Sequence, residues 1–327
     1  METDPQQELI ALSRNPLHGV TLTFDGTQGT TPHQLNAQFA QITPEPQNEA
    51  VWQLVDEGER YQSLITLTQA TERWQLAVQC EGQGVFELNQ NSLTIDWQPG
   101  GTGPAHYLQT MGISLFLELN GHLCLHANTL VKNQQAHLFL APSRTGKSTL
   151  TALLTTLGYT LTTDDMAALY QTAQQPMQYQ VYPSWAKVRL WPDSAELLKS
   201  QLTNQAVQQK KVHQRFAKQE ISFAPQRTHA PTPVKAMYYL NRTEPTDSAE
   251  SDQVTLTRIA PSAALIILMQ NSMLGDAYRA LGIEKQRIQA LAELLQSIPF
   301  YKVSYPSGLE NLPNIANQID KLINNQN

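Results

Sequence analysis

The stretch 136–165, AHLFLAPSRTGKSTLTALLTTLGYTLTTDD, constrains the fold of this chain more than any other. It opens with the apolar run 138–140, which predicts a strand. A turn containing glycine and lysine follows, and then a helical pattern of leucines that Gly158 ends, where a left-handed cap is expected. A second short strand, 159–163, leads into a pair of aspartates. The stretch therefore predicts strand, loop, helix, strand and acidic pair, in that order.

The turn has the spacing of a phosphate-binding loop, with Ala141 in place of the first glycine. Such a loop directs several backbone N–H groups at one point, where the helix N-terminus adds a partial positive charge. Lys147 supplies a full charge for the β- and γ-phosphates, and the Ser148 hydroxyl suits Mg²⁺. The alternative is an ordinary strand–turn–helix with a chance Gly-Lys-Ser. The residues expected to bind the nucleotide are Ser143, Arg144, Thr145, Gly146, Lys147, Ser148 and Thr149.

Two positions of this loop depart from the usual pattern. A glycine at Ala141 or Arg144 would allow unusual φ values and a close approach of the backbone to a ligand. Ala141 is acceptable if its φ stays negative, and Arg144 is either accommodated or itself contacts phosphate. Asp164 and Asp165 end the next strand, where carboxylates can reach a metal or an incoming hydroxyl.

Three spacings carry a resemblance to a known family. His126, within Leu125-His126-Ala127, lies 21 residues before Lys147; the Gly-Lys-Ser is intact; and the Asp-Asp pair follows the lysine by 17 and 18 residues. In these features the chain resembles the bacterial HPr serine kinase/phosphorylase superfamily, and its HPr-kinase-related members more closely than HPr kinase proper. The likeness extends more loosely over 107–319, where 188–193 is similar to the related kinases.

The resemblance implies an α/β fold with a P-loop kinase core of the HPr kinase/PEP carboxykinase-like type, using ATP and Mg²⁺. It makes Asp165 the general base, with His126 orienting or tuning it. The implied catalytic residues are Asp165, His126, Lys147 and Arg189, and the implied metal ligands are Ser148 and Asp164. Arg189 would stabilise charge on the transferred phosphoryl group. Without the resemblance, His126 is a polar residue on a buried strand and Arg189 belongs to a surface ion pair.

One departure from the family concerns the metal. HPr kinase proper carries a Leu-Glu-Ile-Arg-Gly element after its acidic pair, and the glutamate helps to bind the metal. Here the matching stretch is 186–190, AKVRL, with Lys187 where the acid would be. Mg²⁺ would then depend on Ser148, Asp164 and water, or on Asp193. The departure disfavours the reverse, phosphorylase reaction and HPr itself as the substrate.

The glycine- and proline-rich segment 98–104 predicts a boundary between two domains. Residues 1–100 form an N-terminal β-rich module of unknown role, in which period-two patterns predict strands at 63–68, 74–79, 84–88 and 92–97. Residues 101–327 form the nucleotide-binding domain, a central mixed sheet flanked by helices. A buried helix is expected at 105–118, followed by a strand at 123–130 that pairs antiparallel with the phosphate-loop strand.

Composition restricts the partners. The formal net charge of −6 argues against a broad surface for nucleic acid or anionic membrane. No apolar run approaches the roughly 18 residues of a membrane span, and the first residues lack the order of a signal peptide. We therefore expect a cytoplasmic protein with no nucleic-acid or membrane partner. The basic stretch 205–220 is either a solvated face or a positive rim near the phosphates.

Two functions fit the sequence. The first is an ATP-dependent serine kinase that transfers the γ-phosphoryl group to a serine-like hydroxyl of a peptide, a protein or a small molecule. The second is a nucleotide-binding regulator or degraded kinase without transfer activity, which Ala141, Arg144 and the missing glutamate favour. We also allow for a homo-oligomer. The sequence does not identify the phosphate acceptor.

Overall fold

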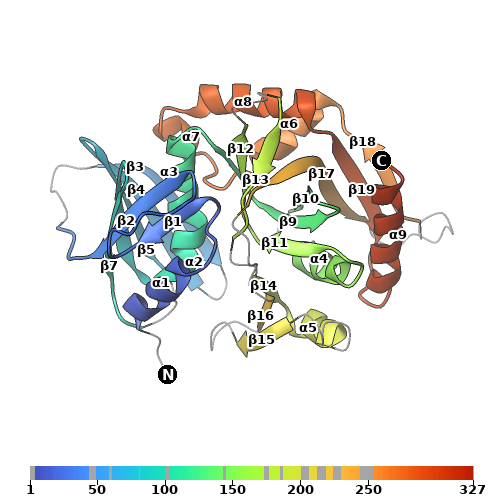
Figure 1. Cartoon of the computed structure of the whole chain (residues 1–327), viewed down its shortest axis with the longest axis horizontal. Coiled ribbons are helices and arrows are strands. Elements are labelled where there is room, and N and C mark those ends of the chain that lie inside the picture. The colour runs from blue at the N-terminus through green and yellow to red at the C-terminus, as the bar shows by residue number, and fades with distance from the viewer. Residues whose placement is uncertain are drawn as a thin grey trace. The chain divides into compact units, whose positions relative to one another are not determined.

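The computed structural model describes residues 4–43, 49–58, 61–80, 82–100, 103–142, 145–172, 177–184, 187–199, 206–211, 219–223, 230–243 and 253–326 (Figure 1). The chain divides into two compact units: unit 1 is Met1–His122 with Met273–Arg287, and unit 2 is Leu123–Ser272 with Ile288–Asn327. The expected boundary at residue 100 differs from this division, because the helical segment 104–119 and the returning segment 273–287 both fall in unit 1.

Unit 1 contains a seven-stranded sheet among its described residues, in the order β1-β2-β7-β6-β5-β4-β3. The strands are β1 (Val20–Thr23), β2 (His33–Phe39), β3 (Ala50–Gly58), β4 (Tyr61–Ala70), β5 (Arg73–Gln79), β6 (Gln83–Asn89) and β7 (Ser92–Trp97). The four strands expected from period-two patterns are present as β4 to β7, which pair antiparallel. The sheet is mixed, because β2 pairs parallel with both β1 and β7.

The helices of unit 1 are α1 (Pro5–Ser13), α2 (Pro104–Tyr107) and α3 (Ile113–Leu119), with α7 (Ala277–Ala280) in the returning segment. The single helix expected at 105–118 is interrupted by one π-helical turn, Leu108–Gly112. This segment packs on the sheet, since the rings of Tyr107 and Trp97 lie 5.5 Å apart. Trp97 in turn contacts Phe86, with ring centroids 5.3 Å apart.

A buried ion pair ties the returning segment to the rest of unit 1. Arg287 Nε donates to both carboxylate oxygens of Glu118, at 3.0 and 3.1 Å, and the two side chains are only 5% and 2% exposed. The guanidinium also lies over the Tyr278 ring, 4.1 Å from its centroid, and the Tyr278 hydroxyl donates to Glu118. A buried carboxylate is tolerated only with such partners, so residues 278–287 complete the core of unit 1.

The strands of unit 2 that are described form a nine-stranded sheet and a separate three-stranded one. The large sheet contains β8 (Leu123–Leu125), β9 (Ala127–Lys132), β10 (Gln135–Leu140), β11 (Thr160–Thr163), β12 (Ala167–Gln171), β13 (Tyr179–Val181), β17 (Thr232–Thr243), β18 (Thr255–Arg258) and β19 (Phe300–Pro306). The small sheet contains β14 (Lys187–Leu190), β15 (Ala206–Lys211) and β16 (Gln219–Phe223).

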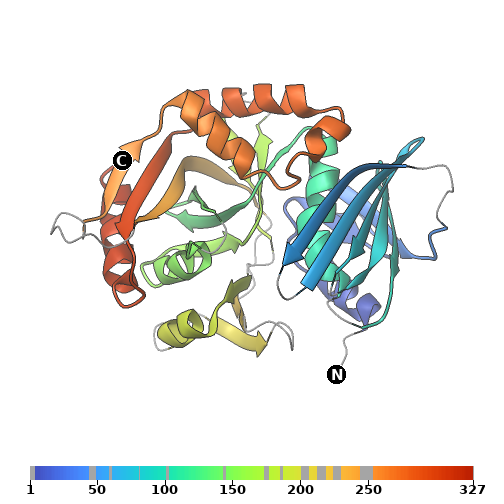
Figure 2. The ribbon, with the colours of Figure 1, turned by 180° about the vertical axis from the view of Figure 1, so that it is seen from behind.

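The centre of the large sheet is parallel and covered on both faces. β17 pairs parallel with β10 and with β19, and β9 pairs antiparallel with β10, as predicted. Alternate residues of β10 enter different cores: Phe139 packs with residues of helices α4 (Lys147–Thr155) and α9 (Leu312–Asn324), whereas Leu138 packs with residues of α6 (Pro261–Gln270) and α8 (Glu284–Ser297). Figure 2 shows the same layers from behind. This arrangement confirms the expected mixed α/β class.

The strand expected at 123–130 is two strands, and His126 lies at the break between them. β8 pairs with β12, whereas β9 pairs with β10 and β11. At the break the backbone N–H of His126 donates to the Asn271 carbonyl at 2.7 Å. The chain therefore changes partners at His126, which frees its side chain from the regular alternation of a strand.

Among the described helices of the chain, none is long and apolar enough to cross a membrane.

Acid should destabilise unit 1 through a buried histidine. His18 is 1% exposed, and burial lowers its pKa from 6.5 to about 3. Between pH 6.5 and about 3, His18 is protonated in the unfolded chain but stays neutral in the folded chain. The stability from neutral His18 is therefore present above pH 6.5 and is lost as the pH falls toward 3, at up to about 1.4 kcal/mol per pH unit. Urea unfolding at pH 7, 6 and 5 should show this slope.

The control is His18→Asn, because asparagine tolerates the positive φ of 52° at this position and does not titrate. Its stability should fall less steeply with pH than that of the wild type. An identical slope in the two proteins would show that His18 does not carry the acid sensitivity.

Candidate functional site

The loop between β10 and α4 gives the site its framework. α4 begins at Lys147 directly after Gly146, whose φ is 93°, and the first helical hydrogen bond runs from the Leu150 N–H to the Gly146 carbonyl at 2.9 Å. A side chain at such a φ is strained, so the turn into the helix requires glycine. Ala141, by contrast, is not among the described residues with positive φ, which is the condition under which alanine was expected to be acceptable there.

A cavity of about 230 Å³ opens at this end of α4. The predicted site residues that line it are His126, Thr145, Gly146, Lys147, Ser148, Thr149, Asp165 and Arg189. The cavity is also lined by Trp191 and Ser194, which follow Arg189 in the chain, and by Arg242, Tyr305 and Leu312 from the C-terminal part of the chain. Of the predicted nucleotide-binding residues, Ser143 and Arg144 lie outside the described part of the chain.

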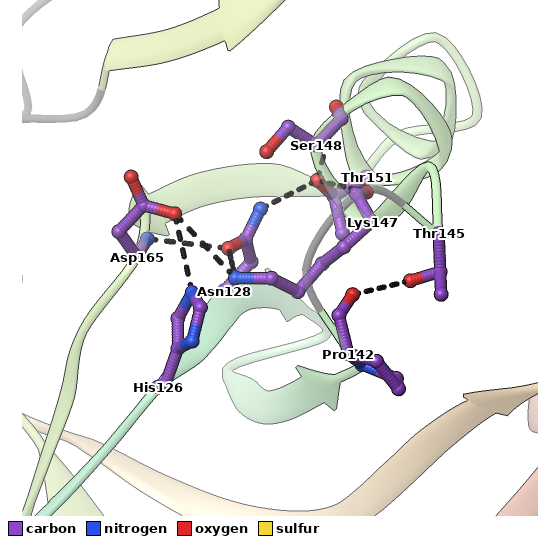
Figure 3. A network of polar contacts seen from close by, with 8 residues as sticks. All are labelled: His126, Asn128, Pro142, Thr145, Lys147, Ser148, Thr151 and Asp165. Atoms are coloured by element: carbon purple, nitrogen blue, oxygen red, sulfur yellow. Dashed lines mark hydrogen bonds and ion pairs between the residues drawn. The ribbon is translucent and has the colours of Figure 1, made fainter. Parts of the chain in front are cut away.

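A polar network joins four residues of this cavity and the strand behind it (Figure 3). The Lys147 Nζ, on a side chain only 7% exposed, donates to Asn128 Oδ1 at 2.7 Å and lies 3.6 Å from Asp165 Oδ1. The same Asp165 oxygen lies 3.6 Å from His126 Nε2. The structure thus brings the side chains of His126, Lys147 and Asp165 together.

Asp165 lies at the centre of a tight turn. Its φ is 62°, in the left-handed region, and the Met166 N–H donates to the Asp164 carbonyl at 2.8 Å. A three-residue turn with positive φ at its centre is rare and strained for a residue with a side chain. The turn separates the two aspartates, so that Asp165 lines the cavity and Asp164 does not. The Asp165 N–H donates to Asn128 Oδ1 at 3.2 Å, which supports the turn.

Asp164 has a different environment. Its Oδ1 is buried and has no hydrogen-bond partner among the described residues. Burial raises the pKa of this carboxyl well above its usual range, and the neighbouring charge of Asp165 raises it further, although Lys147, Arg189 and a hydrogen bond from Asn128 act in the opposite direction. A buried oxygen of this kind is held at a cost unless a cation or donor satisfies it.

Arg189 lines the cavity and also takes part in an ion pair. Its Nε lies 3.9 Å from Glu220 Oε2, and the Lys187 Nζ lies 3.0 Å from Glu220 Oε1. The pairing of β14 with β16 places Arg189 opposite Glu220 and produces both contacts. The two interpretations of Arg189, site residue and ion-pair partner, therefore coexist in the structure. Asp193 lies in the first turn of α5 (Pro192–Lys199) and is not among the residues that line the cavity.

The sequence analysis missed Asn128. It is fully buried, and besides its bonds to Lys147 and Asp165 its Nδ2 donates to Thr151 Oγ1 at 2.8 Å. The available signal was an asparagine inside an apolar strand, two residues after His126. Tyr305 was also missed; its hydroxyl donates to the Thr145 carbonyl at 3.3 Å and so holds the loop from the end of β19.

The donor set is consistent with a magnesium ion. Mg²⁺ prefers oxygen ligands and usually takes only one or two carboxylates from the protein. Ser148 lines the cavity. Asp164 does not line it, but this residue directly precedes Asp165, which does, and its buried Oδ1 has no hydrogen-bond partner among the described residues. Among the described residues, no group of three His, Cys, Asp or Glu side chains gathers in the way that a wholly protein-held metal would require.

No protein-family model and no curated protein matches the chain. Among solved structures, the Hpr(Ser) kinase/phosphatase from Coxiella burnetii is similar at 16% identity over 62% of this chain and 97% of that one, with a TM-score of 0.30. At that TM-score the likeness carries no argument about fold or function.

A pair of glycine variants can distinguish the effect of backbone strain on stability from an effect on nucleotide binding. Gly146 and Gly158 lie at opposite ends of α4, with φ of 93° and 86°, and a Cβ at either would meet open space. We expect Gly146→Ala and Gly158→Ala each to lower the free energy of unfolding by roughly 1–2 kcal/mol. Only Gly146→Ala should also weaken Mg-ATP binding, because Gly158 does not line the cavity. Calorimetry and urea unfolding measure the two effects, and an equal loss of affinity in both would contradict the assignment.

Proposed function

We propose that the chain is an HPr kinase-like, ATP-dependent serine kinase that transfers the γ-phosphoryl group to a hydroxyl of a peptide, a protein or a small molecule. One observation supports this most: the Asp165 carboxylate lies 3.6 Å from both Lys147 Nζ and His126 Nε2, in a cavity at the N-terminus of α4. A cation for phosphate, a helix N-terminus and a carboxylate for the acceptor proton are the parts that phosphoryl transfer needs.

The proposed reaction assigns one task to each group. The triphosphate lies against the N–H groups that begin α4, and Lys147 contacts the β- and γ-phosphates. Asp165 accepts the proton of the acceptor hydroxyl while the oxygen of that hydroxyl attacks the γ-phosphorus. The bond from the γ-phosphorus to the β–γ bridging oxygen breaks, and ADP is released. His126 orients the Asp165 carboxylate. Arg189 stabilises negative charge on the transferred group once its guanidinium turns from Glu220.

Mg²⁺ would be held by Ser148 and Asp164. When bound, the ion neutralises charge on the phosphate oxygens and offsets the unpartnered, buried Asp164 oxygen. The chain's own contribution is to supply these two oxygens and to keep Lys147 and Arg189 on the cavity wall.

The second candidate, a nucleotide-binding regulator without transfer, is favoured by one observation. Lys187 occupies the position where HPr kinase proper carries a metal-binding glutamate, and the acidic residue beside it, Glu220, forms ion pairs with Lys187 and Arg189. A carboxylate engaged in this way is not presented to a metal. The two candidates differ in transfer but share nucleotide binding, so binding is tested first.

Lys147→Ala should largely remove Mg-ATP binding, because a charged hydrogen bond to phosphate is lost. A loss of about 10- to 100-fold in affinity is expected from interactions of this class. The matched control is Lys132→Ala, since Lys132 belongs to β9 of the same unit but pairs with Asp320 at 2.6 Å. Titration calorimetry measures both variants. Equal affinity of Lys147→Ala and the wild type would count against the loop as the phosphate site.

The two aspartates should respond differently to the same substitution. Asp165→Asn keeps the shape of the side chain but removes its basicity, so transfer should fall by about 10²- to 10⁴-fold while nucleotide binding persists. Asp164→Asn should mainly raise the Mg²⁺ concentration that is needed for half-maximal transfer. The assay is transfer from γ-labelled ATP to a library of serine-containing peptides and small alcohols. A wild-type rate in Asp165→Asn would mean that another residue is the base, and a wild type that binds ATP but never transfers would support the regulator.

A further inference from the structure

The proton acceptor and the phosphate-binding lysine of this site are close enough to neutralise each other. The Lys147 Nζ and Asp165 Oδ1 lie 3.6 Å apart, with the lysine side chain 7% exposed and the aspartate 38% exposed. Attraction between opposite charges grows as water is excluded. The two groups already form an ion pair, which at 3.6 Å is longer than a hydrogen bond. A closer approach would turn the ammonium away from a triphosphate and would occupy the carboxylate oxygen.

Asn128 lies where it can keep that ion pair from closing to hydrogen-bond distance. Its Oδ1 accepts from Lys147 Nζ at 2.7 Å, shorter than the lysine–aspartate distance, and from the backbone N–H of Asp165 at 3.2 Å. One neutral oxygen therefore holds the ammonium and the turn that carries the carboxylate at the same time (Figure 3). A carboxylate at this position would add a negative charge beside the two aspartates, whereas an amide adds none.

The orientation of the Asn128 amide is itself fixed. Nδ2 donates to Thr151 Oγ1 at 2.8 Å, and the Thr151 hydroxyl lies 3.0 Å from the Lys147 carbonyl and 3.2 Å from the Ser148 carbonyl within α4. Asn128 is 0% exposed, so these bonds form without competition from solvent. The Nδ2–Thr151 bond leaves the carbonyl oxygen facing Lys147 and Asp165.

We infer that Asn128 is a positioning residue that keeps the Lys147–Asp165 ion pair from closing to hydrogen-bond distance, so that the lysine can turn to phosphate and the Asp165 carboxylate to the acceptor hydroxyl. The inference rests on the proposed function, because it concerns the same nucleotide site. Asn128 acts through Lys147 and Asp165 and contacts no substrate itself.

The test is a rescue experiment on Mg-ATP affinity. Asn128→Leu keeps the volume but removes the acceptor, so Lys147 should move onto Asp165 and the affinity should fall about tenfold or more. Adding Asp165→Asn to it removes the competing charge and should return the affinity to within about threefold of the Asp165→Asn single variant. A purely structural role for Asn128 predicts no such recovery, because the second substitution repairs no packing.

Two further variants control the experiment. Thr151→Val removes the acceptor of Nδ2 but leaves both Oδ1 bonds, so it should lower the melting temperature while changing the affinity by less than about threefold. If Asn128→Leu does not fold, Asn128→Ala tests the same step with less volume in the core.

The outcomes separate the inference from the proposed function. A wild type that binds neither Mg-ATP nor inorganic tripolyphosphate overturns both. A wild type that binds Mg-ATP, with a double variant as weak as the Asn128 single variant, overturns the inference alone. Unchanged Mg-ATP affinity in the Asn128 single variant also overturns the inference alone.

Discussion

The buried ammonium of Lys147 is the constraint on which the rest of the site depends. A charge that is 7% exposed is tolerated only where polar partners surround it. Those partners come from two strands: Asn128 from β9 and Asp165 from the end of β11, which pairs with β9. β9 also pairs with β10, the strand that leads into α4. The order β11-β9-β10 is therefore the arrangement that brings one helix residue within reach of both partners.

The local parts of this arrangement could be predicted from the sequence. The strand, the loop, the glycine before α4 and the strand ending in two aspartates lie within thirty residues, and each has a signal in backbone chemistry or hydrophobic period. The antiparallel pairing of β9 with β10 followed from the short turn between them. β2 and β3 were missed: β2 (HQLNAQF) contains no β-branched residue, and the apolar residues of β3 (AVWQLVDEG) do not alternate with polar ones.

The remainder depends on contacts between distant residues. Asn128 meets Lys147 across 19 residues and the Asp165 backbone across 37, so its role arises only when the sheet has formed. Glu220 reaches Lys187 and Arg189 through the pairing of β14 with β16, and no periodic pattern in the polar stretch 205–220 specifies that register. That only Asp165 of the two aspartates lines the cavity follows from one positive φ, which a pair of identical residues does not reveal.

The buried pair of Glu118 and Arg287 has a consequence for the order in which the chain is made. The two residues are 169 positions apart, so a nascent chain that has emerged only as far as α3 carries a carboxylate with no guanidinium to meet it. Burying that group alone would cost several kcal/mol, so the early chain is expected to leave α3 loosely packed on the sheet. The N-terminal unit, although synthesised first, therefore reaches its final packing only after residues 123–272 of the other unit have left the ribosome.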